Sequence, residues 1–141
     1  MKEAEIQKIE SALKVQLPKY YRNFLLKHSE DLRAASEKLP LRALLHYDAD
    51  SVISDNEQVR NTRDPFVNQD TEMWPSKYLV AGNNGAGDMW CVDLTSDGRE
   101  IWYFDHEGGG FEKSHDSFDE YMREIKKDLR HPQFWQYPRP S

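Results

Sequence analysis

The sequence predicts an α+β fold, in which N-terminal, middle and C-terminal helices pack on a central antiparallel sheet. Apolar residues recur at helical spacing in the first 30 residues and again over residues 118–129. Between these segments, three short runs rich in β-branched and aromatic residues are separated by turn residues, which is typical of an antiparallel meander. The 141 residues are 38% hydrophobic and 12% aromatic, which suffices for one core. We therefore expect one domain over residues 1–130, followed by a proline- and aromatic-rich tail over 131–141.

Two helices are predicted at the start of the chain. The first occupies residues 3–15, where charged residues separate apolar side chains at helical spacing: Ile6, Ile9 and Leu13. Pro18 ends this pattern and can begin the second helix, because proline disfavours helix in the preceding residue but fits a first helical turn. The apolar face of the second helix comprises Tyr21, Phe24, Leu25 and His28. From residue 29 onward the sequence predicts a less regular helical loop that ends at Pro40.

A short strand and a third helix are predicted next. Residues 42–49 have the apolar character of a strand. The helix after it is indicated by three apolar residues, Val52, Ile53 and Val59. Asp50 or Ser51 is its expected N-cap, and Pro65 its expected end.

Three strands of a meander are predicted in the second half of the chain, over residues 77–82, 89–94 and 100–107. In the middle strand, Met89 and Cys91 alternate with Trp90 and Val92, so both faces are mostly apolar and both are expected to be covered. Cys91, the single cysteine, is then a core thiol that forms no disulfide and no paired-cysteine metal site. An Asp-Gly pair within residues 95–98 favours a tight hairpin.

A closing helix is predicted before the tail. Ser117 and Glu120 form a capping-box pattern at its start. Its apolar face comprises Phe118, Tyr121, Met122, Ile125 and Leu129. The tail carries Phe134, Trp135 and Tyr137, which either pack back on the domain or form an exposed adhesive end.

The glycine-rich loop GNNGAGD, residues 82–88, invites comparison with a phosphate-binding loop. Such a loop leads from a strand into a helix, whose N-terminus meets the anion. This one leads into a strand and lacks the Gly-Lys-Ser/Thr ending. Gly, Asn and Asp share a tolerance of positive φ, so we expect a hairpin turn, with a ligand-facing loop as the alternative.

Charge and composition exclude several classes of function. The net charge of −6 argues against a nucleic-acid binder, which needs clustered Lys and Arg, and better suits a basic partner. The first ten residues are too charged for a secretory signal, and no apolar run approaches the ~20 residues of a membrane span. We therefore expect a cytoplasmic protein with neither a nucleic acid nor a membrane as its partner.

No catalytic residue and no cofactor is predicted. The sequence has no GxSxG motif, and no serine stands out beside a plausible base. Asp105, His106 and Glu107 could ligate a metal, with His115 and Asp88 nearby. Because neighbours on a strand point to opposite faces, only Asp105 and Glu107 would converge, and a polar strand end is the preferred interpretation.

Four stretches in order resemble the SUKH superfamily. They are IQKIESALKVQLPKYYRNFLLKHS, with its LP step; YLVAGNNGAGDMWCVDL, with a Gly-Asp pair opening a strand that ends in Asp-Leu; IWYFDHEGG; and SFDEYMREI. The resemblance covers roughly residues 3–128. Gly87-Asp88 and Asp93-Leu94 match the central motif of the family, whereas the tail after Leu129 is not part of its pattern.

The resemblance implies an α+β domain that binds proteins and is generally not catalytic. The superfamily includes yeast cell-wall-synthesis regulators and bacterial immunity proteins that neutralise toxins, often nucleases. Our leading hypothesis is an immunity protein, not an enzyme, that binds a cognate and basic toxin. The alternatives are a regulatory or scaffold module that binds a host protein and, in a different class, a metal-dependent hydrolase that uses Asp105 and Glu107. The predicted partner-binding residues are Trp74, Asn83, Asn84, Asp88, Asp105 and Glu107.

Overall fold

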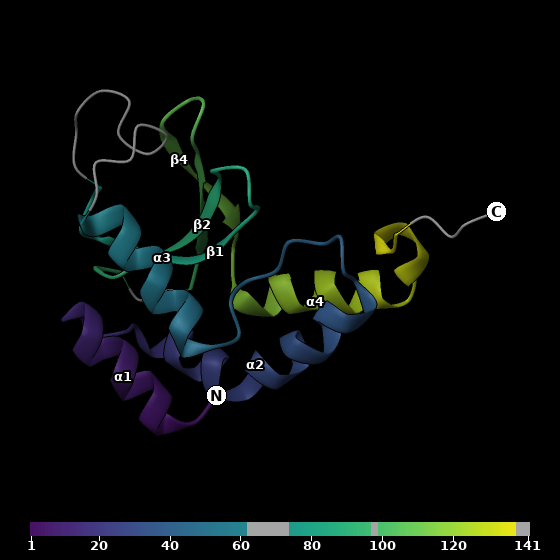
Figure 1. Cartoon of the computed structure of the whole chain (residues 1–141), viewed down its shortest axis with the longest axis horizontal. Helices are drawn as coiled ribbons and strands as arrows, with labels where there is room; N and C mark the ends of the chain where they lie inside the picture. Colours follow the sequence, from purple (N-terminus) through teal and green to yellow (C-terminus); the bar gives the residue numbers. More distant parts are fainter. Residues whose placement is uncertain (62–73, 97–98, 138–141) are drawn as a thin grey trace.

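The computed structural model describes residues 1–61, 74–96 and 99–137, which form an α+β fold (Figure 1). The helices are α1 (Glu3–Leu13), α2 (Lys19–Lys38), α3 (Ala49–Asn61), α4 (Phe118–Leu129) and the 3₁₀ turn η1 (Pro132–Trp135). The strands are β1 (Tyr78–Asn83), β2 (Met89–Asp93), β3 (Ile101–Asp105) and β4 (Gly110–His115). They form one antiparallel sheet in the order β1-β2-β3-β4, which confirms the predicted meander and its flanking helices.

The sheet has an apolar core on each face. The larger core joins α1, α2 and α4 to one face, and Figure 1 shows these helices gathered below the strands. The smaller core comprises Val59, Trp74, Tyr78, Val80, Cys91 and Phe104. Cys91 and Val92 belong to different cores and both are fully buried, which confirms that β2 is covered on both faces. Burial also raises the pKa of the Cys91 thiol, as expected for a core cysteine.

The predicted strand over residues 42–49 is wrong, because only one bridge forms there, between Leu45 and Gly82. The His46 amide donates to the Ala81 carbonyl at 2.8 Å, but the Leu45 amide donates to the Tyr121 hydroxyl at 3.0 Å instead of extending a ladder. Glycine is needed at position 82, since a Cβ there would lie 3.0 Å from the Leu45 Cα. The segment therefore covers the outer edge of β1 without becoming a strand.

The helices differ from prediction at their ends. α2 continues as regular helix to Lys38, where a less regular loop was expected, because buried Leu32 and Ala35 keep its helical spacing. The N-terminus of α3 is capped by Asp48, whose carboxylate accepts from the Ser51 amide at 2.7 Å, so neither Asp50 nor Ser51 is the cap. Pro65 and the Asp-Gly pair at 97–98 lie outside the described residues.

The strand β4 is absent from the sequence prediction. Its residues are mostly polar and half of them are exposed, so it lacks the apolar alternation that marks the other strands. One residue fixes it to the smaller core: the Phe111 ring stacks on Tyr78 with centroids 4.0 Å apart.

The first part of the tail packs back on the domain. The Leu41 amide donates to the Trp135 carbonyl at 2.9 Å, and Trp135 contacts the larger core. The Arg42 guanidinium lies 5.5 Å from the Trp135 ring and pairs with Asp128 of α4 at 2.7 Å. Phe134, which is 74% exposed, remains outside this contact, so both alternatives for the tail apply to different residues.

Candidate functional site

Two hairpin turns lie together at one end of the sheet. Residues 84–88 connect β1 to β2, where Asn83 pairs with Met89, and residues 106–109 connect β3 to β4, where Asp105 pairs with Gly110. In a meander, alternate turns fall at the same end. Five predicted partner-binding residues therefore meet there, and we call them the rim: Asn83, Asn84, Asp88, Asp105 and Glu107.

The glycine-rich loop is a hairpin turn, as predicted. Gly85 and Gly87 have φ of +78° and +105°, values that side-chain-bearing residues rarely adopt. The Asn84 side-chain oxygen accepts from the amides of Ala86 and Asp88, at 2.8 and 3.2 Å. Asn side chains of this segment therefore already bind the backbone amides of Gly85, Ala86 and Asp88.

The Asp88 carboxylate joins the two turns. One oxygen accepts from the backbone amide of His106 at 3.0 Å and lies 2.7 Å from the His106 Nδ1. The other accepts from the Tyr103 hydroxyl at 2.7 Å and from the Asn84 amide group at 3.0 Å. Because these four contacts reach Asn84 in one turn, His106 in the other and Tyr103 in β3, Asp88 holds the two turns together.

These contacts change the acid–base properties of the rim. Burial opposes ionisation of Asp88, but hydrogen bonds from His106, Tyr103 and Asn84 outweigh it and lower the pKa of Asp88 to about 2. The hydrogen bond to Asp88 raises the pKa of His106, and Glu107 and Asp105 add to this effect. Burial and the hydrogen bond to Asp88 together raise the pKa of Tyr103 to about 12.

Replacing Asp88 with asparagine is expected to lower the pKa of His106 toward its ordinary value of 6.5, because the principal partner of the imidazolium loses its charge. The raised pKa of His106 stabilises the fold below pH 6.5, and this contribution disappears as pH rises through the raised value. The depressed pKa of Asp88 stabilises the fold above pH 3.8, and this contribution disappears as pH falls to about 2. An NMR titration of the His106 ring measures its pKa in the wild type and in Asp88→Asn. The same midpoint in both proteins would contradict the expected decrease.

The other rim carboxylates face solvent. Asp105 and Glu107 are exposed, and the Glu107 amide donates to the Asp105 carboxylate at 2.9 Å. The strand β3 ends at Asp105, so the strand alternation that we used to pair Asp105 with Glu107 does not extend to residues 106 and 107. The turn instead brings His106 back toward Asp88.

Trp74, one of the predicted partner-binding residues, does not lie on the surface. Its side chain is 7% exposed, its ring packs edge-on against Phe104 and Phe111, and its Nε1 donates to the Tyr78 carbonyl at 2.7 Å. The indole is therefore a core group with its polar atom satisfied. Polar neighbours in sequence gave no sign of this, because the ring is buried by distant strands.

A ligand set for a metal differs from the one that the sequence suggested. Asp88, Asp105 and His106 each offer a ligand atom within 4.8 Å of the others, whereas His115 lies at the opposite end of β4, paired with Ile101. These three residues could contribute to a cation site. The Asp88 oxygens already accept four hydrogen bonds, which a cation would have to displace.

A second polar group, which the sequence did not predict, contacts the rim residue Asn83. The Asp55 carboxylate of α3 accepts from the Asn83 amide group at 2.7 Å and lies 2.5 Å from the His46 Nε2. Burial opposes ionisation of Asp55, but hydrogen bonds from His46 and Asn83 prevail and lower its pKa. Asn83 is thereby fixed to α3. The spacing of residues in the sequence does not predict this contact, because Asp55 and Asn83 are far apart in the chain.

One serine does lie beside a base, contrary to expectation. The Ser114 Oγ is 2.7 Å from the His115 Nδ1, and the His115 Nε2 is 2.8 Å from Glu124. Glu124 also pairs with Arg42 at 3.2 Å, so the chain of contacts continues into the ion pairs that hold α4. Neither the cavity between α2 and α4 nor the one beside His46 is lined by Ser114, His115 or Glu124. This arrangement ties β4 to α4.

Comparisons with known proteins identify a family for most of the chain. No helix of the described residues is long and apolar enough to span a bilayer. Searches of curated proteins and of solved structures found no match. Residues 1–124 match the family model described as the SMI1 / KNR4 family (SUKH-1), and this match includes every strand, the rim and the start of α4. The chain therefore belongs to the SMI1 / KNR4 family, SUKH-1.

Proposed function

We propose that this protein is an immunity protein that binds a cognate toxin and neutralises it by protein–protein contact. The observation that carries the proposal is family membership across residues 1–124, because SUKH proteins are in general immunity and regulatory proteins and not enzymes. The net charge of −6 further favours a basic partner, such as a nuclease toxin, since opposite charges speed encounter.

The rim is the surface that we assign to the toxin. Asp105 and Glu107 present carboxylates to solvent from one turn. The turn is held by Asp88, so these carboxylates are positioned before a partner arrives. A pre-organised contact loses less conformational entropy on binding than a mobile one.

Co-expression with the toxin encoded beside its gene tests the proposal. Cells that produce the toxin should survive only when this protein is also present, and the purified pair should form a complex. Equal killing with and without the protein would reject toxin neutralisation. A complex with a host protein, in cells that hold no such toxin, would favour the regulatory alternative.

Reversing the charge of Glu107 is expected to weaken toxin binding about tenfold or more, equivalent to about 1.4 kcal/mol. The variant Glu107→Lys suits this test because the side chain is exposed, whereas Asp88 is required within the rim. Glu37→Lys, on an exposed position of α2, is the matched control and should bind like the wild type. Equal affinities of the two variants, measured by calorimetry at low salt, would remove the rim from the interface.

A further inference from the structure

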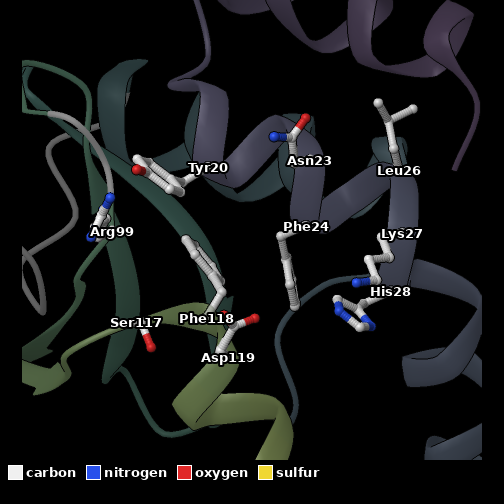
Figure 2. Close-up of a pocket in the computed structure, with 10 residues that line it drawn as sticks. All are labelled: Tyr20, Asn23, Phe24, Leu26, Lys27, His28, Arg99, Ser117, Phe118 and Asp119. Atoms are coloured by element: carbon white, nitrogen blue, oxygen red, sulfur yellow. The ribbon is translucent and has the colours of Figure 1, made fainter.

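A cavity of about 650 Å³ lies between α2 and the first turn of α4. Figure 2 shows its lining side chains arriving from α2 on one side and from Ser117, Phe118 and Asp119 on the other, with Arg99 at one end. Its volume falls within the range of about 300–1,000 Å³ that is typical of ligand sites.

The floor of this cavity is aromatic. Phe24 and Phe118 are nearly buried and stack with ring centroids 4.6 Å apart. Tyr20 and Leu26, which are 37% and 39% exposed, extend this apolar surface along α2. Little of the two phenylalanine rings remains exposed, so an apolar side chain of a ligand that lay over them would cover mainly the exposed surface of Tyr20 and Leu26.

Two cations stand at opposite ends of the floor. Figure 2 shows Arg99 on one side of the two phenylalanine rings and Lys27 on the other. Neither forms an ion pair with a carboxylate of the described residues. The Arg99 guanidinium lies 4.7 Å from the Tyr20 ring, and a guanidinium stacked on a ring keeps its in-plane N–H groups for a carboxylate.

The arrangement of charge limits what can bind. Asp119 is the only acidic residue among the described residues that line the cavity, and Arg99 and Lys27 give this lining a surplus of positive charge in a protein of net charge −6. Figure 2 places Asp119 beside Phe118, between the two cations. A ligand with its carboxylate at the centre would be repelled, whereas a ligand with carboxylates at its ends would be attracted.

The cavity is separate from the rim. Arg99 precedes β3 and Ser117 follows β4, at the end of the sheet where Ile101 pairs with His115. The rim lies at the other end of the same two strands, where Asp105 pairs with Gly110. The cavity and the rim also differ in charge, because Arg99 and Lys27 line the first and Asp105 and Glu107 are exposed at the second.

We propose that this cavity binds an extended acidic peptide segment of a partner protein, with an aromatic side chain over the floor between Tyr20 and Leu26 and carboxylates on Arg99 and Lys27. In an extended peptide, side chains at positions 1, 3 and 5 share one face. A segment of the pattern acid-x-aromatic-x-acid presents the required groups together. Its backbone amides can donate to Asp119.

The probe for this proposal is the blocked pentapeptide Glu-Gly-Phe-Gly-Glu, titrated into the full chain and followed by ¹H–¹⁵N NMR. Saturable shifts are expected at the amides of α2 around Asn23 and of α4 around Phe118. Lys-Gly-Phe-Gly-Lys and Glu-Gly-Ala-Gly-Glu should each bind at least tenfold more weakly. The first removes the charge complementarity, and the second removes the aromatic contact.

Variants of the protein make the test specific. Arg99→Glu and Lys27→Glu should each weaken the acidic peptide at least tenfold, and both residues are exposed, so the fold should survive. Arg130→Glu, an exposed position at the other end of α4, is the matched control and should bind normally. Unchanged binding by both cavity variants would overturn the proposal. Free phenylacetate that bound as tightly as the pentapeptide would also overturn it, in favour of a small carboxylate.

Peptide binding at the cavity is independent of toxin neutralisation. The titration contains only the protein and the peptide, so failure to bind leaves the co-expression result unaffected. Conversely, a toxin that is not neutralised leaves the cavity and its peptide untouched.

Discussion

Replacing Asn56 with alanine is expected to lower the free energy of unfolding by about 3 kcal/mol, the largest effect that we predict for a single polar side chain. Asn56 is fully buried in α3. Its side-chain oxygen accepts from the Val80 amide at 2.8 Å, and its amide group donates to the Val80 carbonyl at 2.8 Å. Both backbone groups of Val80 would lose their partner inside the protein, and a buried unsatisfied group costs about 1–3 kcal/mol.

The two hydrogen bonds between Asn56 and Val80 also explain how the edge of the sheet is covered. β1 is an outer strand, and the polar groups of Val80 point away from β2 toward α3. Asn56 takes the place that a fifth strand would otherwise occupy, beside the segment that contacts Gly82.

Urea unfolding followed by tryptophan fluorescence measures the loss, with Glu57→Ala as the matched control. Glu57 is the next residue of α3 and is exposed, so its replacement should change stability by less than about 0.5 kcal/mol. If Asn56→Ala and Glu57→Ala unfold at the same urea concentration, the edge of β1 does not depend on the asparagine.

The elements that the sequence predicts well are those with a local apolar pattern. α1, α4 and the strands β1, β2 and β3 lie within a few residues of their expected bounds. β4 has no such pattern, because its position depends on pairing with β3 and on the stacking of Phe111 against Tyr78. The expected strand near Leu45 is the opposite case, because an apolar pattern is present there but no strand forms. Leu45 is buried in the core, and its amide donates to the Tyr121 hydroxyl and not to a neighbouring strand.

The same contrast between local patterns and long-range contacts applies to the candidate site. The hairpin of residues 84–88 was predictable from its glycines and asparagines, because their backbone preferences are local. The bond between Asp88 and His106 was not, since it depends on two turns that meet only through the order of the strands. The cavity is less visible still, because Tyr20 and Phe118 are almost a hundred residues apart and each fits an ordinary amphipathic helix.

Replacing Gly87 with alanine is expected to destabilise the fold by about 2–3 kcal/mol and to detach His106 from Asp88. At Gly87 the backbone has φ of +105°, which is unfavourable for any residue with a Cβ. An added Cβ would also lie 3.0 Å from the His106 Cγ and 3.1 Å from its Nδ1, so the ring must move. The ring nitrogen that would move is the one beside the Asp88 carboxylate.

Gly85→Ala separates these two causes. Gly85 has φ of +78°, but an added Cβ there meets nothing within 4 Å, so this variant should lose only about 1 kcal/mol of backbone strain. Urea unfolding compares the two losses, and an NMR titration of the His106 ring shows whether its raised pKa survives. We expect Gly85→Ala to keep the raised pKa and Gly87→Ala to lower it, because only the second forces the imidazole away from its carboxylate. Equal losses of stability with an unchanged His106 titration would mean that Gly87 is required for the turn alone and has no part in joining the two turns of the rim.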